Sequence, residues 1–235
     1  MIWLASYPRS GNTFFRIVLD EVYGIESSSF SAIDPQATTK DYQNYQVVKT
    51  HVLPEYLAPA DPDIPAVYLV RDGRDALVSM AWHRTNMVAP GTSFKDNLLR
   101  AIQAKNSHFG GWSRHVEHWQ RRASIVIRFE DLIQDPLQCV ESIRPLLQLP
   151  PPRKDKLPTF ADLKSSDFEF RSSQIIGWAP PEIRQKFFRK GKVGAWTEEM
   201  PRWMQWLFYY HHGRALRQLG YENRGWLGLA FGKAA

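Results

Sequence analysis

The sequence has very little cysteine and no long hydrophobic run. Its single cysteine, Cys139, excludes an internal disulfide and a four-cysteine zinc site, so a reducing compartment is expected. No stretch reaches the roughly 18 uncharged apolar residues that a membrane span requires. A signal peptide has a basic segment before its apolar run, and the short apolar run at residues 2–5 has none. We therefore expect a soluble, cytoplasmic protein without a membrane span.

The composition is that of a folded protein with a modest positive charge. Of 235 residues, 43% are hydrophobic and 13% aromatic, which supports a sizeable core and excludes disorder and collagen-like fibres. At roughly 150 residues per domain, one domain over residues 1–235 is the simplest expectation. The net charge of +6 suits an anionic ligand but falls well short of a tail that binds nucleic acid.

Predicted strands alternate with predicted helices along the chain. Short apolar runs predict strands at residues 2–5, 45–49, 66–70 and 124–129. Helical spacing predicts helices at residues 14–23, with capping residues at 10–13, and at 73–84, 94–122 with a break near the glycines at 110–111, and 136–147. This alternation favours an α/β fold with a central parallel sheet flanked by helices.

The clearest chemical signal is the loop at residues 7–13, between the first strand and the first helix. Backbone N–H groups at a helix start, hydroxyls from Ser10 and Thr13 and the Arg9 cation suit a phosphate or sulfate. Gly11 allows a close approach to such an oxyanion. The loop lacks the spacing and the lysine of the nucleotide triphosphatase loop. An ordinary capped turn is the alternative if the segment is taken alone.

Five segments in order resemble those of the sulfotransferases that use 3′-phosphoadenosine 5′-phosphosulfate (PAPS). Residues 7–14 resemble the loop that binds the 5′-phosphosulfate, and residues 48–54 resemble the segment with the catalytic lysine and histidine. The remaining segments lie at residues 68–79, 129–136 and 188–196. The resemblance implies a fold related to nucleotide kinases, with PAPS as donor co-substrate and no metal.

The resemblance also implies a role for each matched position in holding the donor. Arg9 would contact the 5′-phosphosulfate where cytosolic relatives usually have lysine, and Phe14 replaces a tryptophan that stacks on adenine in many relatives. The other residues of that loop with a donor-binding role are Ser10, Gly11, Asn12 and Thr13. The implied ligands of the 3′-phosphate are Arg71, Ser79, Arg189, Lys190 and Gly191. A dianionic phosphate suits guanidinium groups and hydroxyl donors.

Lys49 and His51 lie two residues apart at a predicted strand end, so their side chains start toward the same face. A histidine can take a proton from a hydroxyl near neutral pH, and a lysine can neutralise charge on a departing phosphate. The resemblance makes His51 the candidate base, with Lys49 and Arg9 as electrophilic stabilisers. By analogy with phosphoryl transfer, the sulfuryl group would move in line, to a hydroxyl of a small-molecule alcohol or phenol.

Two other functions remain as alternatives at this point. A small-molecule kinase would use the same strand-loop-helix segment, although the missing lysine spacing argues against it. A non-catalytic module would bind nucleotide or nucleic acid through the basic stretch at residues 184–192. The acceptor and the oligomeric state are left open.

Two further groups of residues have a functional and a structural interpretation. A zinc site is imaginable at His108, His115 and His118, but no acidic or cysteine ligand stands at a familiar spacing. An aromatic series near the C-terminus predicts the packed face of a terminal helix, with some members as candidate walls of the acceptor pocket. Its members are Trp196, Trp203, Trp206, Phe208, Tyr209 and Tyr210.

Overall fold

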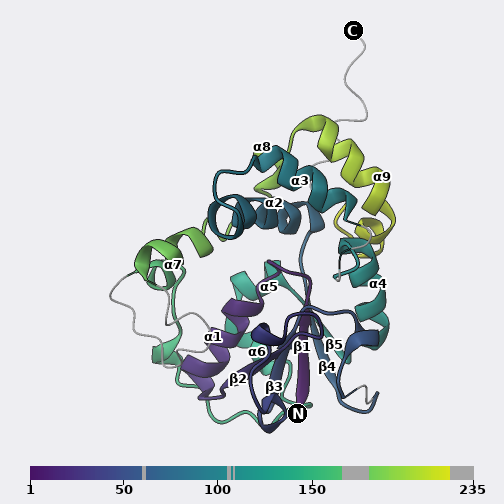
Figure 1. Ribbon diagram of the computed structural model, residues 1–235. Helices are drawn as coiled ribbons and strands as arrows, with labels where there is room; N and C mark the ends of the chain where they lie inside the picture. The colour runs from purple at the N-terminus through teal and green to yellow at the C-terminus, as the bar shows by residue number, and fades with distance from the viewer. Residues whose placement is uncertain (60–61, 105–106, 108, 166–179, 223–235) are drawn as a thin grey trace.

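The computed structural model describes residues 1–59, 62–104, 107, 109–165 and 180–222. In these residues a parallel five-stranded sheet has the order β2-β3-β1-β4-β5 (Figure 1). The strands are β1 (Ile2–Ser6), β2 (Ser27–Phe30), β3 (Val47–Thr50), β4 (Ala66–Val70) and β5 (Ile125–Arg128). The predicted α/β fold is therefore confirmed.

Helices cover both faces of the sheet and its carboxyl end. The α-helices are α1 (Asn12–Tyr23), α2 (Gly73–His83), α3 (Phe94–Gln103), α4 (Trp112–Arg122), α5 (Phe129–Gln134), α6 (Pro136–Glu141), α7 (Pro181–Phe187), α8 (Trp196–Glu199) and α9 (Arg202–Gln218). Short turns of helix are η1 (Pro35–Ala37), η2 (Tyr42–Asn44), η3 (Pro54–Tyr56), η4 (Arg84–Val88), η5 (Lys154–Lys156) and η6 (Asp162–Lys164). Figure 1 shows α2, α3, α8 and α9 beyond the carboxyl ends of the strands, with α1 and α4 on opposite sides of the sheet.

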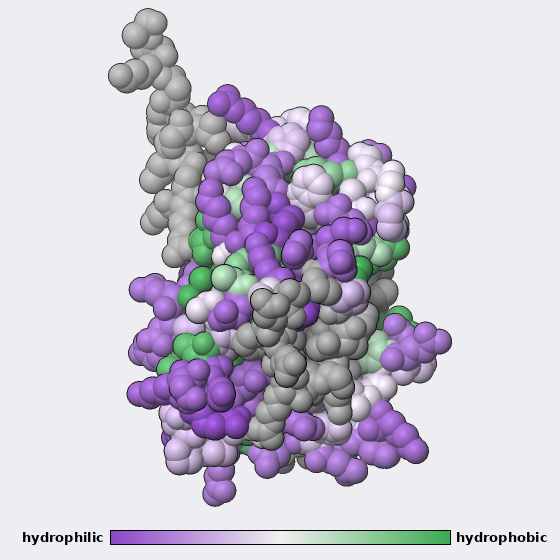
Figure 2. Space-filling view, turned by 90° about the vertical axis from the view of Figure 1, so that its left-hand side faces the viewer, coloured by the Kyte–Doolittle hydropathy of each residue, from purple (hydrophilic) through white to green (hydrophobic). Residues whose placement is uncertain are grey.

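Alternation along β1 sends side chains into two separate cores. Trp3 and Ala5 join the cluster beneath α2, α4 and α9, whereas Ile2 and Leu4 join the cluster beneath α1 and α6. Every residue of β1 is buried, which is expected of a central strand covered on both faces. The surface on the side of α7 is mostly hydrophilic where described residues form it (Figure 2).

The sequence located most elements, and the structure differs from the prediction at several places. The predicted strand at 45–49 is β3, Val47–Thr50, and β2, Ser27–Phe30, was missed because three serines give little apolar signal. The predicted helix at 136–147 ends as an α-helix at Glu141. The cap of the first helix lies within residues 10–13 as expected: it is Gly11, which caps the helix without a side-chain hydrogen bond.

The terminal helix differs most from its prediction. Trp196 and Phe208 are buried as expected, at 2% and 0% exposure. Trp203, Trp206 and Tyr210 are 55%, 55% and 83% exposed, so the expectation that they belong to a packed face is wrong. Helical spacing alone does not show which side of a helix meets the core when both sides are aromatic.

Candidate active site

The site lies where the direction of the sheet connections reverses. β1 pairs with β3 on one side and with β4 on the other, and the carboxyl ends of these strands are Ser6, Thr50 and Val70. In open parallel sheets this crevice is where ligands bind. The residues that follow these ends are the loop at 7–11, His51 and Arg71, so three of the segments matched in sequence meet here.

The loop after β1 adopts backbone conformations that suit few residues. Arg9 has a φ of 69° and Gly11 a φ of 94°. A Cβ on Gly11 would lie 2.6 Å from Cδ2 of Phe129, the first residue of α5. Glycine is therefore required both by the backbone conformation and by the aromatic ring packed against it.

Several buried donors in this region have no hydrogen-bond partner among the described residues, the Tyr7 hydroxyl among them. Two belong to residues matched to donor ligands in sequence, the Ser10 hydroxyl and Nε of Arg71. Buried polar groups are rarely left unpaired, and both groups can donate to an anion. Their chemistry fits the phosphate and sulfate oxygens of a bound donor. Oδ1 of Asn12 also lacks a partner within the described part of the chain, but it can only accept, so it does not suit an anion.

Asn12 is turned toward the sheet. Its amide nitrogen donates to the carbonyl oxygen of Leu4 at 3.1 Å and to the Ser6 hydroxyl at 3.2 Å. This side chain therefore supports the end of β1 in this structure. Thr13 is half-buried, and Phe14 is half-buried between the core beneath α1 and a small cluster that contains Phe188.

Arg71 joins the first loop to the chain that follows α7. Its Nη1 donates to the carbonyl oxygen of Arg9 at 3.0 Å and its Nη2 to that of Lys192 at 3.2 Å. The guanidinium lies 4.1 Å from the ring centroid of Phe129. Residues 9, 71 and 192, distant in sequence, thus meet at one place.

Arg9 reaches across this place to α2 and α7. Its Nε donates to the Ser79 hydroxyl at 3.2 Å and its Nη2 to the carbonyl oxygen of Phe187 at 2.6 Å. Burial, followed by the positive charges of Arg71 and Arg189, lowers the pKa of Arg9 to about 10. Three guanidinium groups thus lie within electrostatic range of one another, which suits an anionic ligand, and the carboxylates of Asp75, Glu130 and Asp72 offset part of the charge of Arg71.

Arg189 and Lys190 share one carboxylate, that of Glu199 in α8. Arg189 Nη1 lies 2.9 Å from Glu199 Oε2, and Lys190 Nζ lies 2.7 Å from Oε1. Nε1 of Trp82 donates to the same carboxylate at 2.5 Å. Sequence matching did not single out Glu199, which lies after the matched segment at 188–196. Its role as a partner of Arg189 and Lys190 is visible only in the folded structure.

Asp75 fixes the other end of this loop to α2. Its carboxylate accepts hydrogen bonds from the backbone N–H groups of Gly194 at 2.7 Å and Trp196 at 3.0 Å. Burial raises the pKa of Asp75 despite the nearby Arg71. Asp75 lies in a matched segment, but its partners 119 and 121 residues away were not predictable from spacing.

Gly191, between these two anchored ends, packs against an aromatic ring. Its φ is 59°, and a Cβ there would lie 2.6 Å from Cε2 of Phe160. The loop can therefore pass this close to the ring only with glycine at that position.

His51 is held in one tautomer by the end of β1. Its Nδ1 lies 2.7 Å from the Ser6 carbonyl oxygen and 3.2 Å from the Ser6 hydroxyl. A carbonyl oxygen only accepts, so Nδ1 carries the proton and Nε2 has a free lone pair. Burial, then the positive charge of Lys49, holds the pKa of His51 well below its usual range. The ring is therefore neutral near neutral pH and able to accept a proton at Nε2.

Lys49 is next to a second buried cation. Burial, followed by the charge of Arg16, lowers the pKa of Lys49 to about 8. Arg16 lies in α1 and donates from Nε to the Ser27 hydroxyl at 2.7 Å. Sequence reasoning missed Arg16; its place within an otherwise apolar stretch of a buried helix was the available signal.

His115 supports the backbone of His51. Its Nε2 lies 3.2 Å from the His51 carbonyl oxygen, and its Nδ1 lies 3.0 Å from the Tyr68 hydroxyl. Because the carbonyl must accept, Nε2 donates to it and the Tyr68 hydroxyl donates to Nδ1. His118 instead contacts Glu55 at 3.1 Å, and His108 lies outside the described residues. The geometry thus gives the imagined zinc site no support.

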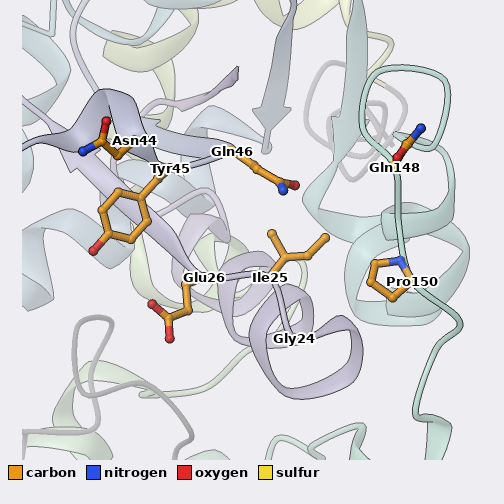
Figure 3. A pocket seen from close by; sticks show the side chains of 8 residues that line it. All are labelled: Gly24, Ile25, Glu26, Asn44, Tyr45, Gln46, Gln148 and Pro150. Atoms are coloured by element: carbon orange, nitrogen blue, oxygen red, sulfur yellow. The ribbon is translucent and has the colours of Figure 1, made fainter.

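A separate pocket of about 370 Å³ lies at the opposite end of the strands. Its walls come from the segments before β2 and β3 and from the chain after α6 (Figure 3). The residues lining it are Gly24, Ile25, Glu26, Asn44, Tyr45, Gln46, Gln148 and Pro150. They include no cation, so this pocket does not suit a donor with two anionic ends.

A parallel sheet with a positively charged loop-helix edge defines an α/β protein of the nucleotide-binding type. The chain matches the sulfotransferase domain family over residues 1–219. It belongs to this family and is a PAPS-dependent sulfotransferase.

Known relatives span most of the chain at low identity. Sulfotransferase 1A1 of Bos taurus is 24% identical, over 91% of this chain and 82% of its own length. Cytosolic sulfotransferase 1 of Danio rerio is 25% identical, over 83% of this chain and 75% of its own length. No helix among the described residues combines the length and apolar character needed to cross a membrane.

Solved structures with a similar fold include two complexes with PAP. Mouse sulfotransferase SULT7A1 complexed with PAP has a TM-score of 0.69 at 20% identity, and the match covers 94% of this chain and 86% of that one. Retinol dehydratase with androsterone and PAP has a TM-score of 0.65 at 18% identity, over 92% of this chain and 80% of that one.

Proposed function

We propose that this enzyme transfers the sulfuryl group of PAPS to a hydroxyl of a small molecule, with His51 as general base. The observation that carries this proposal is the 2.7 Å contact from His51 Nδ1 to the Ser6 carbonyl oxygen. It leaves Nε2 unprotonated and available to the acceptor hydroxyl. Retinol and androsterone, the molecules bound to retinol dehydratase, are both alcohols with a lipophilic body, which supports a small organic acceptor.

The donor would be held at its two anionic ends. We assign the 5′-phosphosulfate to Arg9, Ser10, Gly11 and Thr13, with Asn12 supporting that loop from beneath and Phe14 beside the adenine. The 3′-phosphate is assigned to Arg71, Ser79, Arg189, Lys190 and Gly191. The unpaired donors on Ser10 and Arg71 support this assignment, as do the PAP complexes of similar fold.

Binding of the donor would require the cations to exchange partners. Arg9 now donates to Ser79, and Arg189 and Lys190 pair with Glu199. Phosphate oxygens form stronger charge-assisted hydrogen bonds with guanidinium groups than a neutral hydroxyl does. The Ser79 hydroxyl accepts from Arg9 and keeps its own proton, which it would donate to the 3′-phosphate.

In the transfer step, the acceptor oxygen forms a bond to sulfur as the bond from sulfur to the bridging phosphate oxygen breaks. The acceptor proton moves to Nε2 of His51, and the electron pair of the broken bond stays on the phosphate of the departing PAP. Lys49 and Arg9 neutralise that developing charge. With a pKa of about 8, Lys49 is still mostly protonated at neutral pH and can do this.

Two variants separate the proposed roles of base and donor ligand. His51→Ala should lower kcat by about 100-fold or more because a positioned base is lost, with little change in the Kd for PAP. Arg189→Ala should raise the Kd for PAP, with a smaller effect on kcat at saturating donor. Calorimetry with PAP and turnover of radiolabelled donor with a panel of alcohols, phenols and amines would measure both. Equal effects of the two variants on both quantities would contradict the assignment.

The remaining proposals concern the whole chain. We propose one sulfotransferase domain over residues 1–235, supported by the family match to residues 1–219. A cytoplasmic location is also proposed, supported by a relative named as a cytosolic sulfotransferase.

A further inference from the structure

Helix α9 presents a continuous stripe of aromatic and cationic side chains on its outer face. Trp203 and Trp206 are each 55% exposed and Tyr210 is 83% exposed. Arg214 and Arg217 continue the stripe and are exposed as well. The steps between these five residues are three or four positions, so they lie on one side of the helix.

The opposite side of α9 fixes the helix to the protein. Met204, Phe208, Ala215 and Leu216 are buried in the core cluster that also contains Trp112. Figure 1 shows α9 at the outer edge of the molecule, beyond the sheet. The stripe is thus presented by a firmly packed helix, and burying aromatic rings in the core does not explain it.

The charge of α9 has only one sign. Arg202–Gln218 contains no aspartate or glutamate. Arg217 donates a hydrogen bond to the Tyr209 hydroxyl and approaches Glu222, outside the helix, at 3.5 Å. Tryptophan and tyrosine are enriched where proteins meet the headgroup region of a membrane, and arginine beside them attracts anionic lipids. The stripe therefore complements an anionic lipid surface in its charge and in its side-chain types.

The three rings alone would not supply a dimer interface, so a second copy of the chain would have to contact surface well beyond the stripe. At the exposures given above, the three aromatic side chains offer about 400 Å². A stable dimer requires about 800 Å² from each partner. Shallow insertion of a few rings beside basic residues needs no such area.

We propose that the outer face of α9 docks the enzyme on membranes rich in anionic lipid, with the three rings among the headgroups and Arg214 and Arg217 against lipid phosphates. The helix, about 25 Å long for its 17 residues, would lie flat on the surface. This proposal is independent of the acceptor and of the roles given to the active-site residues.

Vesicle flotation with the full chain tests the proposal. Vesicles would be made of phosphatidylcholine alone or of equal parts phosphatidylcholine and phosphatidylserine, at low and at physiological salt. We expect binding to the mixture, weaker at higher salt, and at least about tenfold weaker in the variant W203S/W206S/Y210S. In the variant R214Q/R217Q we expect the preference for phosphatidylserine to fall by about thirtyfold, as two surface arginines imply.

Tyr56→Ser is a matched control, because Tyr56 is 47% exposed but lies in η3. It should bind vesicles like the wild type, and an unchanged thermal midpoint would show that each variant is folded. Failure of the wild type to bind the mixed vesicles, or equal binding by the stripe variants, would overturn the proposal. Self-association in sedimentation that the aromatic variant abolishes would also overturn it, in favour of a second copy.

Discussion

Gly11→Ala probes the active-site loop through a contact that the structure defines closely. At Gly11 the backbone has a φ of 94°, and a Cβ would lie 2.6 Å from Cδ2 of Phe129. Alanine in the left-handed region costs about 1–2 kcal/mol. Overpacking against a ring in a dense core costs about 1–3 kcal/mol more. We expect a destabilisation of about 3 kcal/mol from the two effects together.

The matched control for this variant is Gly91→Ala. Gly91 has a similar φ of 86°, but no atom lies within 4 Å of the Cβ position. The Gly91→Ala variant should therefore lose only the conformational contribution to its free energy of unfolding, about 1–2 kcal/mol. At about 2–4 °C per kcal/mol for a protein of this size, the midpoint temperature of thermal unfolding should fall by roughly 6–12 °C for Gly11→Ala and by roughly 2–8 °C for Gly91→Ala.

A double-mutant cycle with Phe129→Ala isolates the steric part. If the ring is the obstacle, Gly11→Ala should cost about 1–3 kcal/mol less in the Phe129→Ala background than in the wild type. Chemical denaturation of the four proteins measures this. A Gly11→Ala variant that is no less stable than Gly91→Ala, together with no coupling to Phe129, would refute the reasoning.

The remaining predictions concern His51 and its neighbours. His51 must be neutral to accept a proton and its pKa is lowered, so kcat should stay high below pH 6.5. Above about pH 8, kcat should fall because Lys49 loses its proton. The variant Lys49→Arg should move this alkaline fall in kcat to higher pH, because arginine keeps its charge. An alkaline limb unmoved by Lys49→Arg would exclude Lys49 as its source. His115→Phe should lower kcat by about tenfold by freeing the His51 carbonyl, with an unchanged Kd for PAP, and His115→Gln should recover part of the loss because its amide can donate. Equal kcat for the phenylalanine and glutamine variants would argue for a purely structural His115.

The sequence by itself determined the inner strands of the sheet and the types of side chain that follow the carboxyl ends of these strands. The apolar runs at β1 and β4 and the helical spacing of α1 and α2 depend on neighbours within a few residues, so patterns along the chain are enough to find them. The five matched segments also pointed to the family, because each is a local pattern that can be recognised along the chain. The serine-rich β2 escaped prediction because an edge strand is stabilised by pairing with β3, 20 residues further along the chain.

Only the tertiary structure decided how the side chains are paired. The tautomer of His51 depends on Ser6, 45 residues away, and the two ends of the loop at 189–196 are held by Glu199 and Asp75. The outward stripe of α9 likewise depends on which side of the helix the core occupies. Hydrogen bonds, charge repulsion and burial act between atoms that are near in space, so partners distant in sequence are set only when the sheet and its helices have packed together.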